Sequence, residues 1–164
     1  MSPFKCFLVL LCVLLGAPLS LIAQSPISYK YPPKSISGTW KICRTIVVAE
    51  IVGDKPDWNL NPIGKLINFG KTSVTFEKAA HPILGYRADE FKSAGDFEAI
   101  YGISAKRVGI GPRQISITAQ LADRDETGIV TSEVYPIDSR HIILNWERWF
   151  LSAVRAVDSC GRDQ

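Results

Sequence analysis

The last third of the sequence alternates between apolar and polar residues in short segments that are separated by polar turns. In RQISITAQL every second residue falls on one apolar face of an extended chain, namely Ile115, Ile117, Ala119 and Leu121. Similar segments follow at 129–135, 140–146 and 149–157. Such a succession is typical of an antiparallel meander. The core of this chain must therefore come from paired strands.

The first half contains further strand patterns. A run that is rich in β-branched residues starts at Gly38 and places four residues on one alternation, with Arg44 as an exception: Trp40, Ile42, Ile46 and Val48. Residues 63–69 and 72–78 flank Gly70-Lys71 and predict a hairpin. In the middle we expect strands around 83–91 and 97–103. A short helix is expected near 104–108, with Ser104 as N-cap and Gly109 just past its end.

The start of the chain has the layout of a secretory signal peptide. Lys5 precedes an apolar run, which Gly16 and Pro18 interrupt. We expect cleavage after Ala23, which makes the protein secreted or periplasmic; the alternative is a retained signal anchor. Residues 24–35, which are polar and rich in proline, are expected to form an extended leader in solvent. The remainder, 36–164, is predicted to be a single β-barrel domain.

Two cysteines remain after the signal peptide leaves, Cys43 and Cys160. In an exported protein such a pair predicts one disulfide; the alternative is two free thiols. About eight strands can fold as two packed sheets or close into a barrel. A disulfide requires Cα atoms within about 7 Å, so it would bring the first and last strands together. We therefore predict an all-β, up-and-down antiparallel barrel of about eight strands.

Several functional classes have little support in this sequence. The net charge of +3, reduced by one when Lys5 leaves, does not suit a nucleic-acid protein. No second long apolar segment exists, so no membrane span is expected after cleavage. His81 and His141 lack the spacing of metal ligands. The acidic run 123–128 lacks the calcium-loop pattern and is expected to be a solvated turn.

No nucleophile elbow or nucleotide-binding loop is present either. We therefore expect a protein that is not an enzyme and has no cofactor or metal. A pocket in which carboxylates converge with each other, or with one of the histidines, would reverse that expectation. The sequence does not indicate an oligomeric state.

Aromatic residues in the predicted strands are candidates for a ligand site. Four could line the barrel interior: Phe69, Phe76, Tyr101 and Trp146. Trp149 and Phe150 must point to opposite faces of a regular strand. An outward aromatic residue beside Leu151 would form an exposed patch, so Trp149 and Leu151 are candidates for a partner surface. Alternatively, a neighbouring segment covers this face.

The tripeptide Gly38-Thr39-Trp40 resembles the G-x-W that opens the first strand of lipocalins and their calycin relatives. Export, chain length and covalent closure of first to last strand are also similar. Lipocalins pack an arginine of the last strand across that tryptophan, and Arg155 matches it in position. The resemblance implies a barrel that binds a ligand or acts as an inhibitor, with Gly38, Trp40 and Arg155 as closure residues rather than ligand contacts.

From these observations we expect an exported barrel that binds a small apolar or amphipathic ligand. The alternative is a module that interacts with, or inhibits, an exported protein through loops or an exposed aromatic patch. An internal cavity would favour the first function, whereas a filled interior would favour the second.

Overall fold

The computed structural model describes residues 26–49, 61–90, 93–112, 114–122, 133–146 and 149–161. Nine strands and two helices are described in this part of the chain. In chain order they are β1 Ile27–Tyr29, β2 Gly38–Val48, β3 Leu66–Phe69, β4 Ser73–Phe76, β5 Ala79–Glu90, α2 Ala94–Tyr101, α3 Ala105–Val108, β6 Ile115–Leu121, β7 Glu133–Pro136, β8 His141–Trp146 and β9 Trp149–Arg155.

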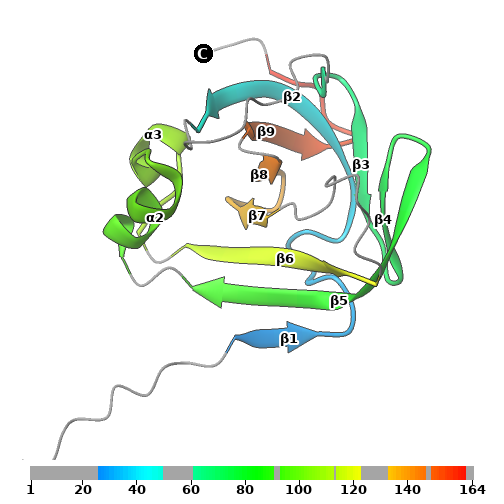
Figure 1. Ribbon diagram of the computed structural model, residues 1–164. Coiled ribbons are helices and arrows are strands. Elements are labelled where there is room, and N and C mark those ends of the chain that lie inside the picture. The colour runs from blue at the N-terminus through cyan, green and yellow to red at the C-terminus, as the bar shows by residue number, and fades with distance from the viewer. Residues whose placement is uncertain are drawn as a thin grey trace, which may run out of the picture.

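Strands β2 to β9 form a closed antiparallel barrel (Figure 1). Each strand pairs with its neighbour in the chain, and β9 pairs with β2 to close the ring. The pairing of Trp40 with Arg155 and of Val48 with Trp149 marks the two ends of this closing seam. The predicted all-β, up-and-down barrel of eight strands is thereby confirmed.

A disulfide joins Cys43 to Cys160 across this seam, with the Cα atoms 5.5 Å apart. Cys43 lies within β2 and Cys160 follows β9, so the bond ties the first strand of the ring to the segment after the last. The predicted disulfide is confirmed. In the described parts of the chain, neither helix has the length and apolar character that crossing a bilayer requires.

Part of the expected leader belongs to the sheet. Strand β1 pairs with β5 on the outside of the barrel, with Tyr29 opposite Tyr86. A Cβ at Gly85 would lie 2.7 Å from the carbonyl oxygen of Tyr29, so the crossing of β1 requires a glycine at this position. Residues 27–29 are extended and exposed, as the sequence predicts, but their backbone is paired rather than free in solvent.

The segment that connects β5 to β6 forms two helices. The expected strand at 97–103 is wrong, because α2 occupies residues 94–101. Ser93 and Asp96 form a reciprocal capping box at its start, and Gly102 ends it in a left-handed conformation. These local signals outweigh the β-prone composition. The helix expected near 104–108 is confirmed as α3, with Ser104 capping it and Gly109 ending it.

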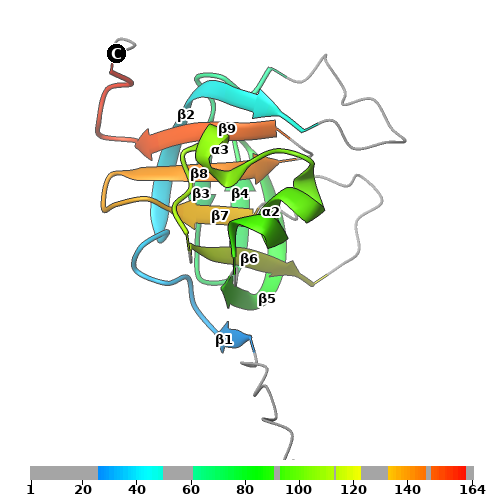
Figure 2. The same cartoon turned by 90° about the vertical axis from the view of Figure 1, so that its left-hand side faces the viewer.

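Two apolar clusters flank the wall of strands. The inner cluster faces the barrel interior and consists of Ile36, Trp40, Ile42, Ile67, Phe69, Val74, Tyr86, Ala88, Ile117, Ala119, Val134, Ile142, Leu144, Trp146, Leu151 and Ala153. The outer cluster joins both helices to the wall and consists of Ala49, Phe97, Tyr101, Ile103, Ala105, Val108, Ile110, Tyr135, Ile143 and Phe150. Figure 2 shows the helices lying over the strands of that wall.

Candidate functional site

One end of the barrel, which we call the base, is closed by Trp40 and Arg155. The Trp40 indole is fully buried, and its Nε1 donates a 2.7 Å hydrogen bond to the carbonyl oxygen of Ile36. The guanidinium carbon of Arg155 lies 3.9 Å from the centroid of the Trp40 ring. The position that the sequence predicts for Arg155, across this tryptophan, therefore agrees with the geometry.

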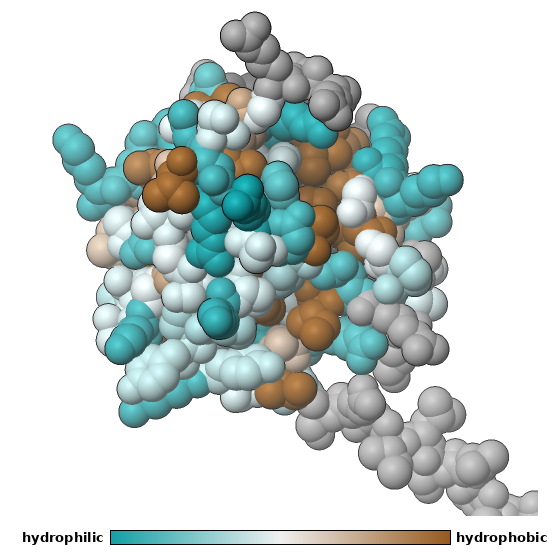
Figure 3. All heavy atoms as spheres, turned by 180° about the vertical axis from the view of Figure 1, so that it is seen from behind, coloured by the Kyte–Doolittle hydropathy of each residue, from teal (hydrophilic) through white to brown (hydrophobic). Residues whose placement is uncertain are grey.

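Hydrogen bonds hold the arginine in place. Its Nε donates to the carbonyl oxygen of Ser139 over 3.1 Å, and its Nη1 donates to that of Ser37. A Cβ at Gly38 would lie 3.2 Å from Nη1, and Gly38 has a φ of 100°, so a side chain would be unfavourable here. Figure 3 views the base from outside, where side chains form a continuous surface. The base is built for closure.

The opposite end, which we call the far end, is less tightly covered. It lies where β2 ends at Val48 and β9 begins at Trp149. Phe69 and Val74, which are close to the base, are almost completely buried. Phe76, Ile83, Leu121 and Trp149 pack on the inner cluster while staying partly exposed. Three of these, Phe76, Leu121 and Trp149, lie at strand ends away from the base. The side chains of the inner wall are therefore almost completely buried near the base and partly exposed near the far end.

Trp146 lies in this far half and carries a polar group, the indole N–H. Its ring packs edge-on against Phe76, with 4.4 Å between the centroids and 71° between the planes. The side chain is buried, yet its Nε1 has no hydrogen-bond partner in the described part of the chain. The ammonium of Lys65 lies 5.5 Å from the centroid of the same Phe76 ring. Lys65 also forms a 3.4 Å ion pair with Glu77.

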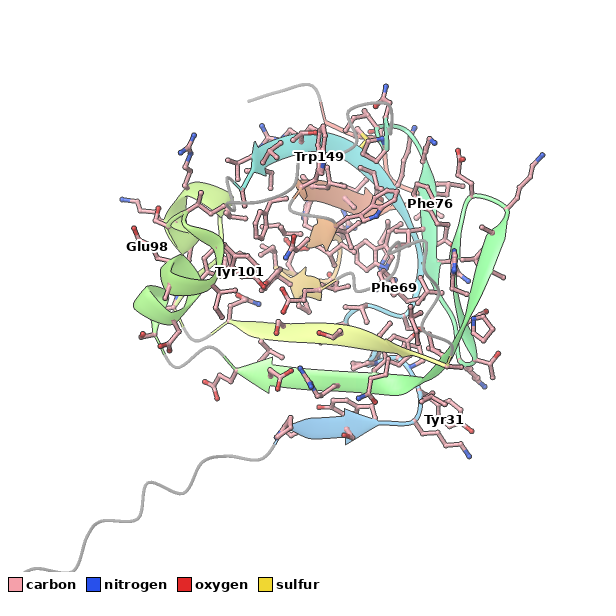
Figure 4. All side chains as sticks on the ribbon, viewed as in Figure 1. Tyr31, Phe69, Phe76, Glu98, Tyr101 and Trp149 are labelled. Atoms are coloured by element: carbon pink, nitrogen blue, oxygen red, sulfur yellow. A yellow bond between two sulfur atoms is a disulfide. The ribbon has the colours of Figure 1, made fainter. Side chains whose placement is uncertain are left out.

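The structure places three of the four expected lining residues at the inner cluster. Phe69 and Trp146 belong to it, and Phe76 packs against it. The expectation for Tyr101 is wrong, because α2 carries this residue to the outer cluster. Figure 4 shows Tyr101 between the helices and the wall, whereas Trp149 lies under the arch of β2.

The expected outward patch also differs from the structure. Leu151 is fully buried in the inner cluster, and Trp149 packs against the same cluster. Phe150, between them, faces outward but is fully buried as well, because it contacts Phe97 and Tyr101 of α2. This arrangement corrects the expectation of an exposed surface at Leu151 and matches the alternative in which a neighbouring segment covers this face.

The outer cluster contains a hydrogen-bonded polar group that sequence reasoning missed. The Glu133 carboxylate accepts from the hydroxyls of Tyr101 and Tyr135, the latter over 2.9 Å, and from the Asn145 amide over 3.2 Å. Burial raises the pKa of both tyrosines, and the hydrogen bond or charge of Glu133 adds to this rise. The pairing of β7 with β8 brings Glu133 to Asn145, and the packing of α2 on the wall brings Tyr101 to them, so the sequence contains no local signal of this group.

The two histidines do not meet a carboxylate cluster. His141 lies at the surface, where its Nδ1 is 2.8 Å from the Asp138 carboxylate. A hydrogen bond from the backbone N–H of Arg140 is the main cause that lowers the pKa of Asp138. Among the described residues, no group of three His, Cys, Asp or Glu side chains could hold a metal ion. The acidic run 123–128 lies outside the described residues.

Comparisons with protein-family models, with curated proteins and with solved structures gave no match to this chain. The geometry of the barrel and its own residues therefore carry the functional argument.

Proposed function

We propose that this protein is an exported carrier that binds a small apolar or amphipathic molecule in the far half of the barrel interior. The observation that carries the proposal is the graded inner wall, closed at the base and lined at the far end by partly exposed apolar side chains. An eight-stranded barrel is just wide enough to be filled by side chains or to hold one small ligand.

The contrast between the two ends supports this function. At the base, Trp40 and Arg155 are committed to closure by hydrogen bonds and by their stacking. At the far end, Phe76 and Trp149 present aromatic surface that is not completely covered. Aromatic rings provide large contact areas for apolar ligands, and such sites usually combine an apolar lining with a few polar groups.

A fluorescent probe tests the proposal directly. The neutral dye N-phenyl-1-naphthylamine should bind the oxidised protein saturably, with one site per chain. Ile83→Trp would add a large side chain to the interior and should abolish binding, because Ile83 packs on the inner cluster. The matched control is Leu84→Trp at the next residue, which is 73% exposed and should leave binding unchanged. Absence of saturable binding to the wild-type protein would contradict the proposed function.

A second candidate function is binding of an exported protein partner through β1. Apolar side chains are exposed on and beside this strand, among them Ile27, Tyr29 and Leu84. A short exposed strand can accept an extended segment of another chain. Replacing these three residues by serine should remove a partner that the wild-type protein retains in a pull-down from the exported fraction. Identical partners for both proteins would contradict this surface.

A further inference from the structure

We infer that the ligand of the barrel is an amphiphile with an anionic, hydrogen-bond-accepting end, which binds at Trp146 and Lys65. This inference rests on the proposed function and adds to it the polarity and orientation of the ligand. The argument comes from the two polar groups that meet at Phe76.

The first group is the Trp146 indole N–H. It can only donate, and the described part of the chain offers it no acceptor although the side chain is buried. The same interior contains a contrasting example, because the Nε1 of Trp40 donates to the carbonyl oxygen of Ile36. Buried donors are normally paired. A ligand oxygen that accepts from Trp146 would satisfy the remaining donor.

The second group is the Lys65 ammonium. Lys65 lies just before β3, and its carbonyl oxygen accepts a 3.0 Å hydrogen bond from the backbone N–H of Ile42, a residue of the inner cluster. Its Nζ lies over the Phe76 ring, and its side chain is only 31% exposed. Glu77 is the acidic partner, with a side chain that is 50% exposed. The ammonium therefore lies against Phe76, the same ring that the unpaired indole contacts.

Phe76 joins these two groups. Trp146 packs against its ring in a T-shaped arrangement, and the Lys65 ammonium lies 5.5 Å from the centroid of the same ring. An alkyl chain would lie against the apolar wall, with a carboxylate or phosphate oxygen at Trp146 and Lys65.

Isothermal titration with four C12 amphiphiles, each below its micelle concentration, tests this orientation. The probes are dodecanoate, dodecyl phosphate, dodecan-1-ol and dodecyltrimethylammonium. We expect at least one anionic probe to bind about tenfold more tightly than the ammonium probe, and the stronger anion identifies the head group.

Two substitutions separate the two contacts. Trp146→Phe keeps a ring but removes the donor, and should weaken binding of the anionic probes and of dodecanol by about tenfold. Lys65→Gln should weaken the anionic probes about fivefold and leave dodecanol unchanged. The matched control is Lys71→Gln, because Lys71 lies 5.6 Å from the exposed ring of Tyr31 and should not affect any probe.

If Trp146→Phe does not fold, the indole N–H resonance of Trp146 can be followed by NMR in the wild-type protein instead. Dodecanoate should shift the Trp146 indole N–H resonance downfield and slow its exchange with solvent. Equal binding of all four probes, or an unchanged indole resonance in the complex, would overturn the inference. Binding of N-phenyl-1-naphthylamine would then show that the proposed function still stands, whereas failure of every probe would overturn both.

Discussion

Asn145 and Trp146 are neighbours on β8, yet they belong to different environments on the two faces of one wall. Trp146 lies in the inner cluster with an unpartnered donor, whereas Asn145 lies outside with an unpartnered Oδ1 acceptor. The outer face also contains a carboxylate that accepts three hydrogen bonds.

The two faces of the same strands therefore differ in role. On the outside, Tyr101 of α2 bonds to Glu133 of β7, so polar contacts fix a helix on the wall. On the inside, aliphatic and aromatic side chains form the inner cluster. Strands β8 and β9 are buried on both faces, which explains their nearly continuous apolar sequence. We interpret the outer cluster as structural and the inner cluster as the binding region.

The largest expected effects come from truncating one side chain in each cluster. Phe150→Ala should destabilise the protein by about 3–5 kcal/mol and Leu151→Ala by about 2–5 kcal/mol, because both are fully buried. Urea unfolding measures the loss. Hydrogen exchange should accelerate in α2 for Phe150→Ala only, while dye binding should change for Leu151→Ala only. Equal effects on both readouts would show that the two clusters are not separate.

Removal of the disulfide should affect both clusters together. In Cys43→Ser combined with Cys160→Ser we expect a loss of about 2–4 kcal/mol, since a crosslink over 117 residues restricts the unfolded chain. Tryptophan fluorescence reports mainly on the inner side, and hydrogen exchange in α2 reports on the outer side. Coincident urea transitions are expected, and separated transitions would mean that the seam supports one cluster more than the other.

Alkaline pH should weaken the protein through its buried tyrosines. The pKa values of Tyr101 and Tyr135 in the outer cluster are raised, and burial raises that of Tyr86 in the inner cluster to about 12. The unfolded chain loses these protons first, so stability is complete below pH 10 and falls as pH rises above it. Each tyrosine that stays protonated contributes a slope of about 1.4 kcal/mol per pH unit.

Tyr101→Phe isolates the contribution of the outer cluster. The decline in the free energy of unfolding between pH 10 and 11 should become shallower in this variant. Tyr29→Phe is the control, since Tyr29 lies on the exposed strand β1. The same slope in both variants would contradict a role of the outer hydroxyls.

The smallest effect should come from Gly85→Ala, which touches neither cluster. A Cβ there would collide with the carbonyl oxygen of Tyr29, so β1 should detach. We expect faster proteolysis near residues 27–29 and a change of no more than about 1 kcal/mol in barrel stability. Loss of dye binding in this variant would mean that β1 supports the interior as well.

Much of the architecture was predictable because alternation, turns and cysteine pairing are local or compositional signals. The meander, the disulfide and α3 all follow from them. The contact of Arg155 with Trp40 was expected only from the resemblance to lipocalins. In β2 the alternation was misleading. Register irregularities between Ile42 and Arg44 and between Thr45 and Val47 change the facing of residues, so that Ile46 packs on the outer cluster.

The candidate site was predictable only in part. Alternation along β8 identifies Trp146, but the sequence cannot tell that its donor lacks a partner, because that depends on which strands surround it. Lys65 and Glu133 could not be singled out from the sequence, because their roles depend on contacts with other strands. Lys65 contacts Phe76, and Glu133 accepts a hydrogen bond from Asn145. For Tyr101, the capping box at Ser93 outweighed a strand pattern that its aromatic neighbours favoured.

The disulfide also sets how the protein responds to mechanical load. A force applied between the leader and the residues after Cys160 runs from Cys43 straight through the sulfur bridge. Most of β2 and strands β3 to β9 lie within the bypassed loop and are shielded from that force. Under oxidising conditions the barrel should therefore resist end-to-end extension, while reduction should return nearly the whole ring to the loaded path.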